Sequence, residues 1–155
     1  MKISVYVFGK IKTKYWNTAC KDFIGRIRHY STFELRELKD SRFDEKDMGK
    51  AIEDESGRLL ATLPDNAFFI ALDSRGKMLD SPGLASLLNE KQNYGPAEVV
   101  FAIGGAFGFS KEVLQRANMV VSLSEMTFPH ELARVILLEQ IYRACTILRG
   151  EKYHK

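Results

Sequence analysis

The sequence has few cysteines and no long apolar run. Its two cysteines, Cys20 and Cys145, form no Cys-x-x-Cys pair, which argues against a disulfide framework and favours reduced thiols in a cytoplasmic protein. The longest uninterrupted apolar stretch, residues 67–72, is six residues long, far below the roughly 20 that a membrane-spanning helix needs. Lysines interrupt the apolar N-terminal stretch, so no signal peptide is predicted. We therefore expect a cytoplasmic protein without a membrane partner.

Several catalytic motifs are also absent. The three histidines, His29, His130 and His154, have no spacing typical of metal ligands, so no metal is expected. There is no phosphate-binding loop ending in Gly-Lys-Ser/Thr and no Gly-x-Ser-x-Gly nucleophile elbow. These absences exclude the kinase, hydrolase and metalloenzyme interpretations.

The charge is modest but unevenly distributed. The net charge is +3, with 12 basic and 7 acidic residues in 1–50, 4 and 8 in 51–100, and 7 and 5 in 101–155. Two basic ends flank an acidic middle, and either end could face phosphate groups. Ordinary solvated helix faces would give the same pattern, so charge alone leaves both interpretations open.

Strand-like and helix-like stretches alternate along the whole chain, with no linker or repeat between them. Two of the expected strands are apolar on both faces, which is typical of a parallel sheet covered by helices on each side. We therefore predict one α/β domain, residues 1–155, with a parallel-rich sheet covered by helices. The expected strands are 3–8, 33–38, 67–72, 98–103 and 119–123, and the main expected helices are 15–29, one ending near 63, one beginning near 82, and 129–149.

Proline, glycine and capping residues predict where these elements end. Residues 73–76 should end the third strand, and the charged run 39–50 should be a loop. Ser81, which precedes a proline, and Ser110 should cap helices, and Gly150 should stop the last one.

The last expected helix is unusual because residues 135–138 are all apolar. Apolar side chains then point around most of its circumference, unlike those of a surface helix. Either the domain wraps this helix, or one face meets a second subunit. The second possibility leads us to expect a homodimer.

Three loops with glycine or polar residues follow expected buried strands, after residues 72, 103 and 123. In open α/β sheets ligands bind outside the carboxyl ends of strands, so these loops would form one pocket if their strands are neighbours. The glycines of the second loop, Gly104, Gly105 and Gly108, would serve either a tight turn or the close approach of a flat ligand.

Four short motifs, taken in order, resemble one known family. They are Gly104-Gly105-x-x-Gly108, the segment Leu-Ser-Glu-Met-Thr-Phe-Pro-His at 123–130, the segment Glu-Gln-Ile-Tyr-Arg-Ala at 139–144, and the ending Tyr153-His154-Lys155. The combination and the chain length resemble the RlmH family of the SPOUT superfamily. Its members methylate N3 of a pseudouridine in 23S ribosomal RNA.

The resemblance implies a deep trefoil knot near the C-terminus, a homodimer, and S-adenosyl-L-methionine held in the knot. General rules of chain topology disfavour a knot, because threaded chains are nearly absent among proteins. The residues that the resemblance assigns to the cofactor coincide with the three strand ends. They are Leu72, Gly104, Leu123, Ser124, Glu125, Met126, Thr127 and Phe128.

The implied reaction also needs groups that align the nucleotide and accept its N3 proton. Candidates for the base are His154, His130 and Glu125, of which His130 could instead cap a helix and Glu125 could be a solvated loop residue. Arg143 could take part in catalysis and, together with Tyr142, Tyr153 and His154, hold the target nucleotide. We expect the C-terminal tail of one subunit to help close the site of the other.

Two other functions remain open at this point. The chain could bind RNA or the ribosome without catalysis, which measured cofactor binding would argue against. It could also methylate a different RNA. Because no separate RNA-binding module is present, the assembled ribosome is the expected partner, presenting the nucleotide of its 23S RNA.

Overall fold

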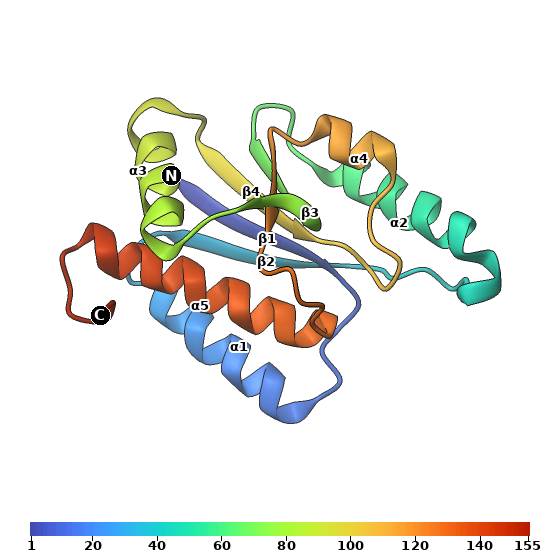
Figure 1. Ribbon diagram of the computed structural model, residues 1–155, viewed down its shortest axis with the longest axis horizontal. Coiled ribbons are helices and arrows are strands. Elements are labelled where there is room, and N and C mark those ends of the chain that lie inside the picture. Colours follow the sequence, from blue (N-terminus) through green and yellow to red (C-terminus); the bar gives the residue numbers. More distant parts are fainter.

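Five parallel strands form one sheet in the computed structural model, which describes residues 1–155. The strand order is β2-β1-β4-β3-β5, and helices lie on both faces (Figure 1). The strands are β1 (Lys2–Phe8), β2 (Thr32–Leu38), β3 (Phe68–Met78), β4 (Glu98–Ile103) and β5 (Met119–Ser122). The helices are α1 (Lys14–Ile27), the 3-10 helix η1 (Glu45–Asp47), α2 (Met48–Thr62), α3 (Ser81–Tyr94), α4 (Lys111–Arg116) and α5 (His130–Leu148). The expected α/β class is confirmed.

The sheet separates two hydrophobic cores because alternate residues of a strand point to opposite faces. On one face Val5 and Val7 of β1 pack with α1, α3 and α5, whereas Tyr6 and Phe8 face the side of α2 and α4. Figure 1 shows α5 lying between α1 and α3 on the first face. The edge strand β2 is largely half-buried, as its alternation with charged residues predicts.

The third strand is longer than the sequence predicts. Residues 73–76 do not end it; instead the register against β5 shifts between Leu72 and Lys77, and β3 continues to Met78. A Cβ added to Gly76 would lie 2.7 Å from backbone atoms of Val120 and Val121. The missing side chain therefore allows the strand to pass this closely along β5.

Three other boundaries refine the expectations. Asp80, not Ser81, caps α3, because the Asp80 Oδ1 accepts a hydrogen bond from the Gly83 N–H at 2.7 Å. The charged run 39–50 is only partly a loop, since it contains η1 and the start of α2. Ser110 does cap α4, and Gly150 follows α5 with a φ of +67°.

Helix α5 is buried on the sides that meet its neighbours. Leu137, Leu138 and Ile141 are almost fully buried, and the helix packs against both α1 and α3. Wrapping by the domain thus accounts for much of its apolar circumference. Val135 and Ile136 stay half-buried within one chain.

One charged side chain lies inside the fold. Arg134 of α5 is 1% exposed, and its Nη2 donates hydrogen bonds to the carbonyl oxygens of Phe8 at 2.5 Å and Gly9 at 2.9 Å. Its Nε and Nη1 have no partner, and burial lowers the pKa of the guanidinium. Arg134 thus ties the end of the first strand to the last helix.

None of the helices combines the length and the apolar character needed to cross a lipid bilayer.

Candidate active site

The carboxyl ends of three neighbouring strands meet at one cavity. β3 pairs with both β4 and β5, so the three segments that the sequence selects come from adjacent strands, although the one after Leu72 is an irregular part of β3 and not a loop. Their ends enclose a cavity of about 190 Å³. Its walls include Leu72 of β3, Ile103 of β4, and Leu123 and Phe128 after β5. A cavity therefore lies where the sequence predicts the ligand site.

A second, more apolar cavity of about 350 Å³ adjoins the first and shares Leu72 and Leu123 with it. It runs between α3 and α5, where Leu84, Ile136 and Gln140 line it. Together the two cavities offer an elongated slot rather than a single round pocket.

Two serines shape the loop 123–128. Ser122 Oγ donates to the carbonyl oxygen of Ser124 at 2.9 Å, and Ser124 Oγ accepts from the Met126 N–H at 3.0 Å. The backbone N–H groups of Glu125, Thr127 and Phe128 have no partner within the chain. The loop therefore has a fixed shape and still offers free hydrogen-bond donors.

The glycine loop makes a tight turn beside this cavity. The N–H of Gly108, at φ +82°, donates to the carbonyl oxygen of Gly105 at 3.1 Å. A Cβ on Gly104 would lie 3.2 Å from the backbone of Gly108. Of the two uses predicted for these glycines, the structure shows the tight turn. Gly104 follows the cavity residue Ile103 directly but does not itself line either cavity.

A buried carboxylate that no sequence pattern singles out lies behind the glycine loop. Glu55 of α2 is 7% exposed and accepts a hydrogen bond from the Ser41 N–H at 2.9 Å. A Cβ on Gly105 would overlap with its Oε2. Desolvation raises the pKa of the Glu55 carboxyl.

This pKa shift predicts a pH dependence of stability. Because its pKa is raised in the folded state, Glu55 takes up a proton more readily there than in the unfolded chain. The contribution of Glu55 to the free energy of unfolding is therefore fully present below the pKa of the carboxyl in the unfolded chain. It is lost as the pH rises through the pKa of the carboxyl in the folded protein. We expect wild type to lose stability relative to Glu55→Gln between pH 4 and pH 7 in urea unfolding. A constant difference across this range would contradict the assignment.

Two of the three candidate bases, His130 and Glu125, lie outside both cavities of the slot. His130 is exposed at the start of α5 and lines a different, 130 Å³ cavity together with Glu55 and Gly105. Glu125 is exposed on the loop and lines neither cavity of the slot. The structure thus brings His130 to the back of the glycine loop, and Glu125 to solvent.

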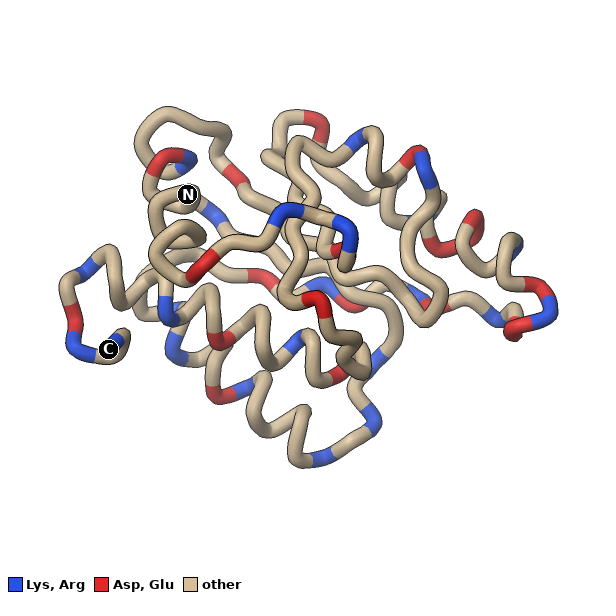
Figure 2. Tube along the Cα trace, in the orientation of Figure 1, with Lys and Arg blue, Asp and Glu red and all other residues tan.

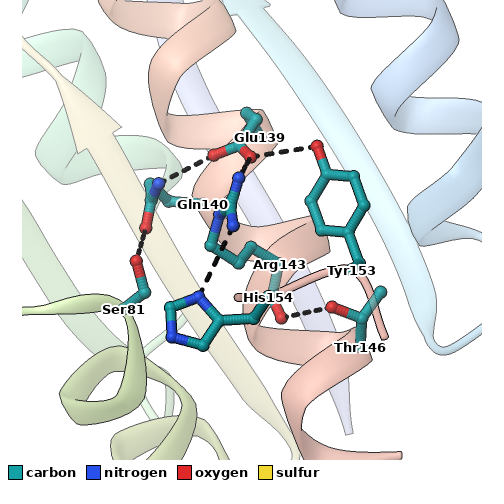
Figure 3. A network of polar contacts seen from close by, with 7 residues as sticks. All are labelled: Ser81, Glu139, Gln140, Arg143, Thr146, Tyr153 and His154. Atoms are coloured by element: carbon teal, nitrogen blue, oxygen red, sulfur yellow. Dashed lines mark hydrogen bonds and ion pairs between the residues drawn. The ribbon is translucent and has the colours of Figure 1, made fainter. Parts of the chain in front are cut away.

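Three remaining candidates, Arg143, Tyr153 and His154, gather around Glu139, which directly precedes the cavity residue Gln140 on α5 (Figure 3). Glu139 Oε1 accepts from Arg143 Nε at 3.0 Å, from Arg143 Nη2 at 2.5 Å and from the Tyr153 hydroxyl at 3.1 Å. Arg143 Nη1 lies 3.5 Å from Nδ1 of His154. The carboxylate raises the pKa of Arg143, and mainly burial raises that of Tyr153.

Gln140 connects this network to the slot. Its Nε2 donates to Glu139 Oε2 at 2.7 Å, and its Oε1 accepts from Ser81 Oγ at 2.6 Å. Both Gln140 and Ser81 line the second cavity. Tyr153 of the tail is thus joined to the slot by hydrogen bonds that run through Glu139 to Gln140 and Ser81.

Tyr142 lies in an aromatic cluster rather than in the slot. Its ring centroid is 4.7 Å from that of Tyr153, 6.0 Å from that of Tyr30 and 6.1 Å from that of Phe23. The Arg26 guanidinium lies 5.6 Å from the centroid of the same ring. This packing holds the C-terminal tail against α1 and α5.

The central role of Glu139 was missed in the sequence, although one signal was there. Glu139 and Arg143 are four residues apart on one helix, the spacing of a favourable ion pair. Glu55 had no comparable signal, because its burial depends on packing against the glycine loop. The structure shows no group of three side chains placed to hold a metal ion.

The network predicts that Glu139→Gln loosens the tail. A glutamine amide loses the charge that holds Arg143 in a two-point contact and weakens the bond from Tyr153. We expect trypsin to cleave after Arg149 and Lys152 severalfold faster in this variant than in wild type. Mass spectrometry of the released peptides measures the two cleavage rates. Glu90→Gln, which removes an exposed carboxylate of α3, is the control. Equal cleavage rates in Glu139→Gln and wild type would show that the carboxylate does not hold the tail.

Fold and site together define an α/β protein with an elongated slot at the carboxyl ends of three adjacent parallel strands. A family model described as "Predicted SPOUT methyltransferase" matches residues 1–154. The chain therefore belongs to the SPOUT methyltransferase family. Proteins of this family generally use S-adenosylmethionine, and membership suggests an RNA methyltransferase.

Proposed function

We propose that this protein transfers a methyl group from S-adenosyl-L-methionine to N3 of a pseudouridine in 23S ribosomal RNA, with the assembled ribosome as substrate. The observation that carries the proposal is the slot itself. It is lined by residues of the loop 123–128, which follows β5 and belongs to the segment 123–130 that resembles the RlmH family. The resemblance to the RlmH family supplies the choice of nucleotide and RNA.

The residues of the slot fit the cofactor. Leu72, Leu123 and Phe128 offer apolar walls for an adenine ring, and the free N–H groups of the loop offer donors for its ring nitrogens. Bound S-adenosylmethionine would supply a methyl group on a positively charged sulfur. No carboxylate is needed to hold that charge, which agrees with the apolar character of the second cavity.

Arg143 and His154 are the groups proposed to act on the nucleotide. Two nitrogens of Arg143 are bound by Glu139, so Nη1 is the one directed away from it towards His154. An arginine can only donate, so this contact is a hydrogen bond only in the tautomer of His154 that keeps the lone pair on Nδ1. His154 must therefore leave Arg143 before Nδ1 can accept the N3 proton, and its departure frees Nη1 for the nucleotide.

When His154 leaves Arg143, it would move to the slot of a second subunit. We propose a homodimer in which the tail of one subunit closes the slot of the other, and the deep trefoil knot of the RlmH family around the 123–128 loop. The half-buried Val135 and Ile136 on α5 support an interface along this helix.

The test is transfer of labelled methyl from S-adenosylmethionine to ribosomes that lack the modification, with free 23S RNA in parallel and nucleoside analysis of the product. Label in 3-methylpseudouridine from ribosomes is the expected result. Label in another nucleoside would overturn the proposed target, and absence of cofactor binding would overturn the proposed catalysis. Removing residues 150–155 should abolish transfer; unchanged transfer would contradict the role of the tail.

A further inference from the structure

A cavity larger than either part of the slot lies away from it. It has a volume of about 630 Å³ and is lined by Met1 and Ile3 at the start of β1 and by Thr32 and Phe33 at the start of β2. All strands run parallel, so these amino ends lie at the edge of the sheet opposite the loops of the slot. The cavity is therefore a separate concave site.

Two arginines line this cavity, and the Glu151 carboxylate lies beside it, accepting a hydrogen bond from the hydroxyl of the lining residue Tyr30 at 2.7 Å. Arg28 follows α1 and Arg149 follows α5, and both line the cavity together with His29. Figure 2 shows basic segments at the C-terminal ends of α1 and α5, at the same end of the molecule. Neither arginine has an ion pair, unlike Arg26 and Arg143, and no acidic residue lines the cavity. Such a site attracts an anion.

The rest of the lining is apolar or lacks a hydrogen-bond partner. Phe33, Leu88 and Leu148 offer an apolar wall. Ser31 Oγ is buried in the cavity wall with no hydrogen-bond partner in the chain. An unpaired buried hydroxyl costs free energy, so a rotation of Ser31 that bonds Oγ to a polar ligand atom in the cavity would be favourable.

We propose that this cavity binds one nucleotide of single-stranded RNA. The base would pack against the wall of Phe33, Leu88 and Leu148, and the phosphate would lie between Arg28 and Arg149, whose guanidinium groups bind phosphate well. The volume lies within the range of about 300–1,000 Å³ typical of ligand sites. The choice of an RNA strand over a free nucleotide rests on the proposed function. The site would hold RNA at a distance from the methylated base.

The experiment measures binding of three probes to the full chain: a 5′-phosphorylated single-stranded RNA octamer, uridine 5′-monophosphate and uridine. Binding of the octamer and the monophosphate, with far weaker binding of uridine, is expected. Arg28→Gln combined with Arg149→Gln should weaken octamer binding roughly tenfold or more and lower its salt dependence. Lys46→Gln combined with Lys111→Gln removes the same charge at exposed positions elsewhere and should change binding little.

A second variant tests the apolar part without changing charge. Gln92→Trp places a large ring at the wall of the cavity and should abolish binding of the monophosphate while S-adenosylmethionine binding is unchanged. Cofactor binding separates this proposal from the proposed methyl transfer, since either can fail alone.

Three results would overturn the proposal. Equal weakening by the two double variants would show non-specific attraction. Binding of the monophosphate but not the octamer would show a site for free nucleotides. A change of oligomeric state in the Arg28→Gln, Arg149→Gln variant, measured by sedimentation, would show that a second copy of this chain covers the cavity.

Discussion

Replacing Arg143 with glutamine is expected to lower methyl transfer to ribosomes about a hundredfold, which is typical for removal of one charged group that stabilises a transition state. Arg143 is held on two of its nitrogens by Glu139 and directs Nη1 towards the tail. A lysine should not restore activity, because it lacks the fork that binds Glu139 and a second group together. The measurement is kcat/KM, with cofactor affinity determined by calorimetry.

Arg42→Gln is the matched control, since Arg42 is exposed and its guanidinium lies over the Phe43 ring, 5.5 Å from the centroid. It removes the same charge away from α5 and should leave kcat/KM within about twofold, as expected for a surface charge outside the site. If Arg143→Gln transferred methyl at the wild-type rate, its proposed contact with the nucleotide would be wrong. Loss of cofactor affinity would instead indicate a role in shaping the slot.

Gly76→Ala is expected to destabilise the protein by about 3 kcal/mol, at the upper end of the cost of overpacking. The added Cβ would lie 2.7 Å from the backbone of β5, which cannot move aside as a flexible side chain would. Either the pairing of β3 with β5 opens or the chain shifts at the irregular part of β3 that follows Leu72. Urea unfolding followed by circular dichroism measures the free energy of unfolding.

Gly57→Ala provides a control of opposite sign. Gly57 lies inside α2, and a Cβ there would meet nothing within 4 Å. Alanine favours the helix over glycine by about 1 kcal/mol, so this variant should be more stable than wild type. Similar effects of the two substitutions would show that close contact with β5 is not what requires glycine at position 76.

The sequence predicted the sheet well because local patterns determine its strands. Residues 98–103 are apolar on both faces and occupy a strand with neighbours on each side and helices over both faces. Three loops were expected to meet at one site, and the pairing of β3 with β4 and β5 makes them neighbours. The strand order itself had no local signal, since it depends on which crossovers pack best.

Long-range contacts account for what the sequence did not predict. The extension of β3 past residues 73–76 depends on the backbone of β5, about 45 residues further on. Glu55 is buried by the glycine loop, and no pattern within α2 indicates that it should be. The carboxylate of Glu139 gathers three groups of α5 and the tail, whereas the sequence indicated only its spacing to Arg143.

The buried Arg134 also affects the order of events in folding. Its hydrogen bonds to Phe8 and Gly9 span 126 and 125 residues. The carbonyl groups at the end of β1 therefore have no such partner until α5 has packed against the sheet. Such distant contacts raise the contact order and slow folding. During synthesis, β1 would leave the ribosome long before α5 and would remain without this partner until translation has nearly ended. A shortened chain that ends before α5 should therefore not fold into a stable fragment.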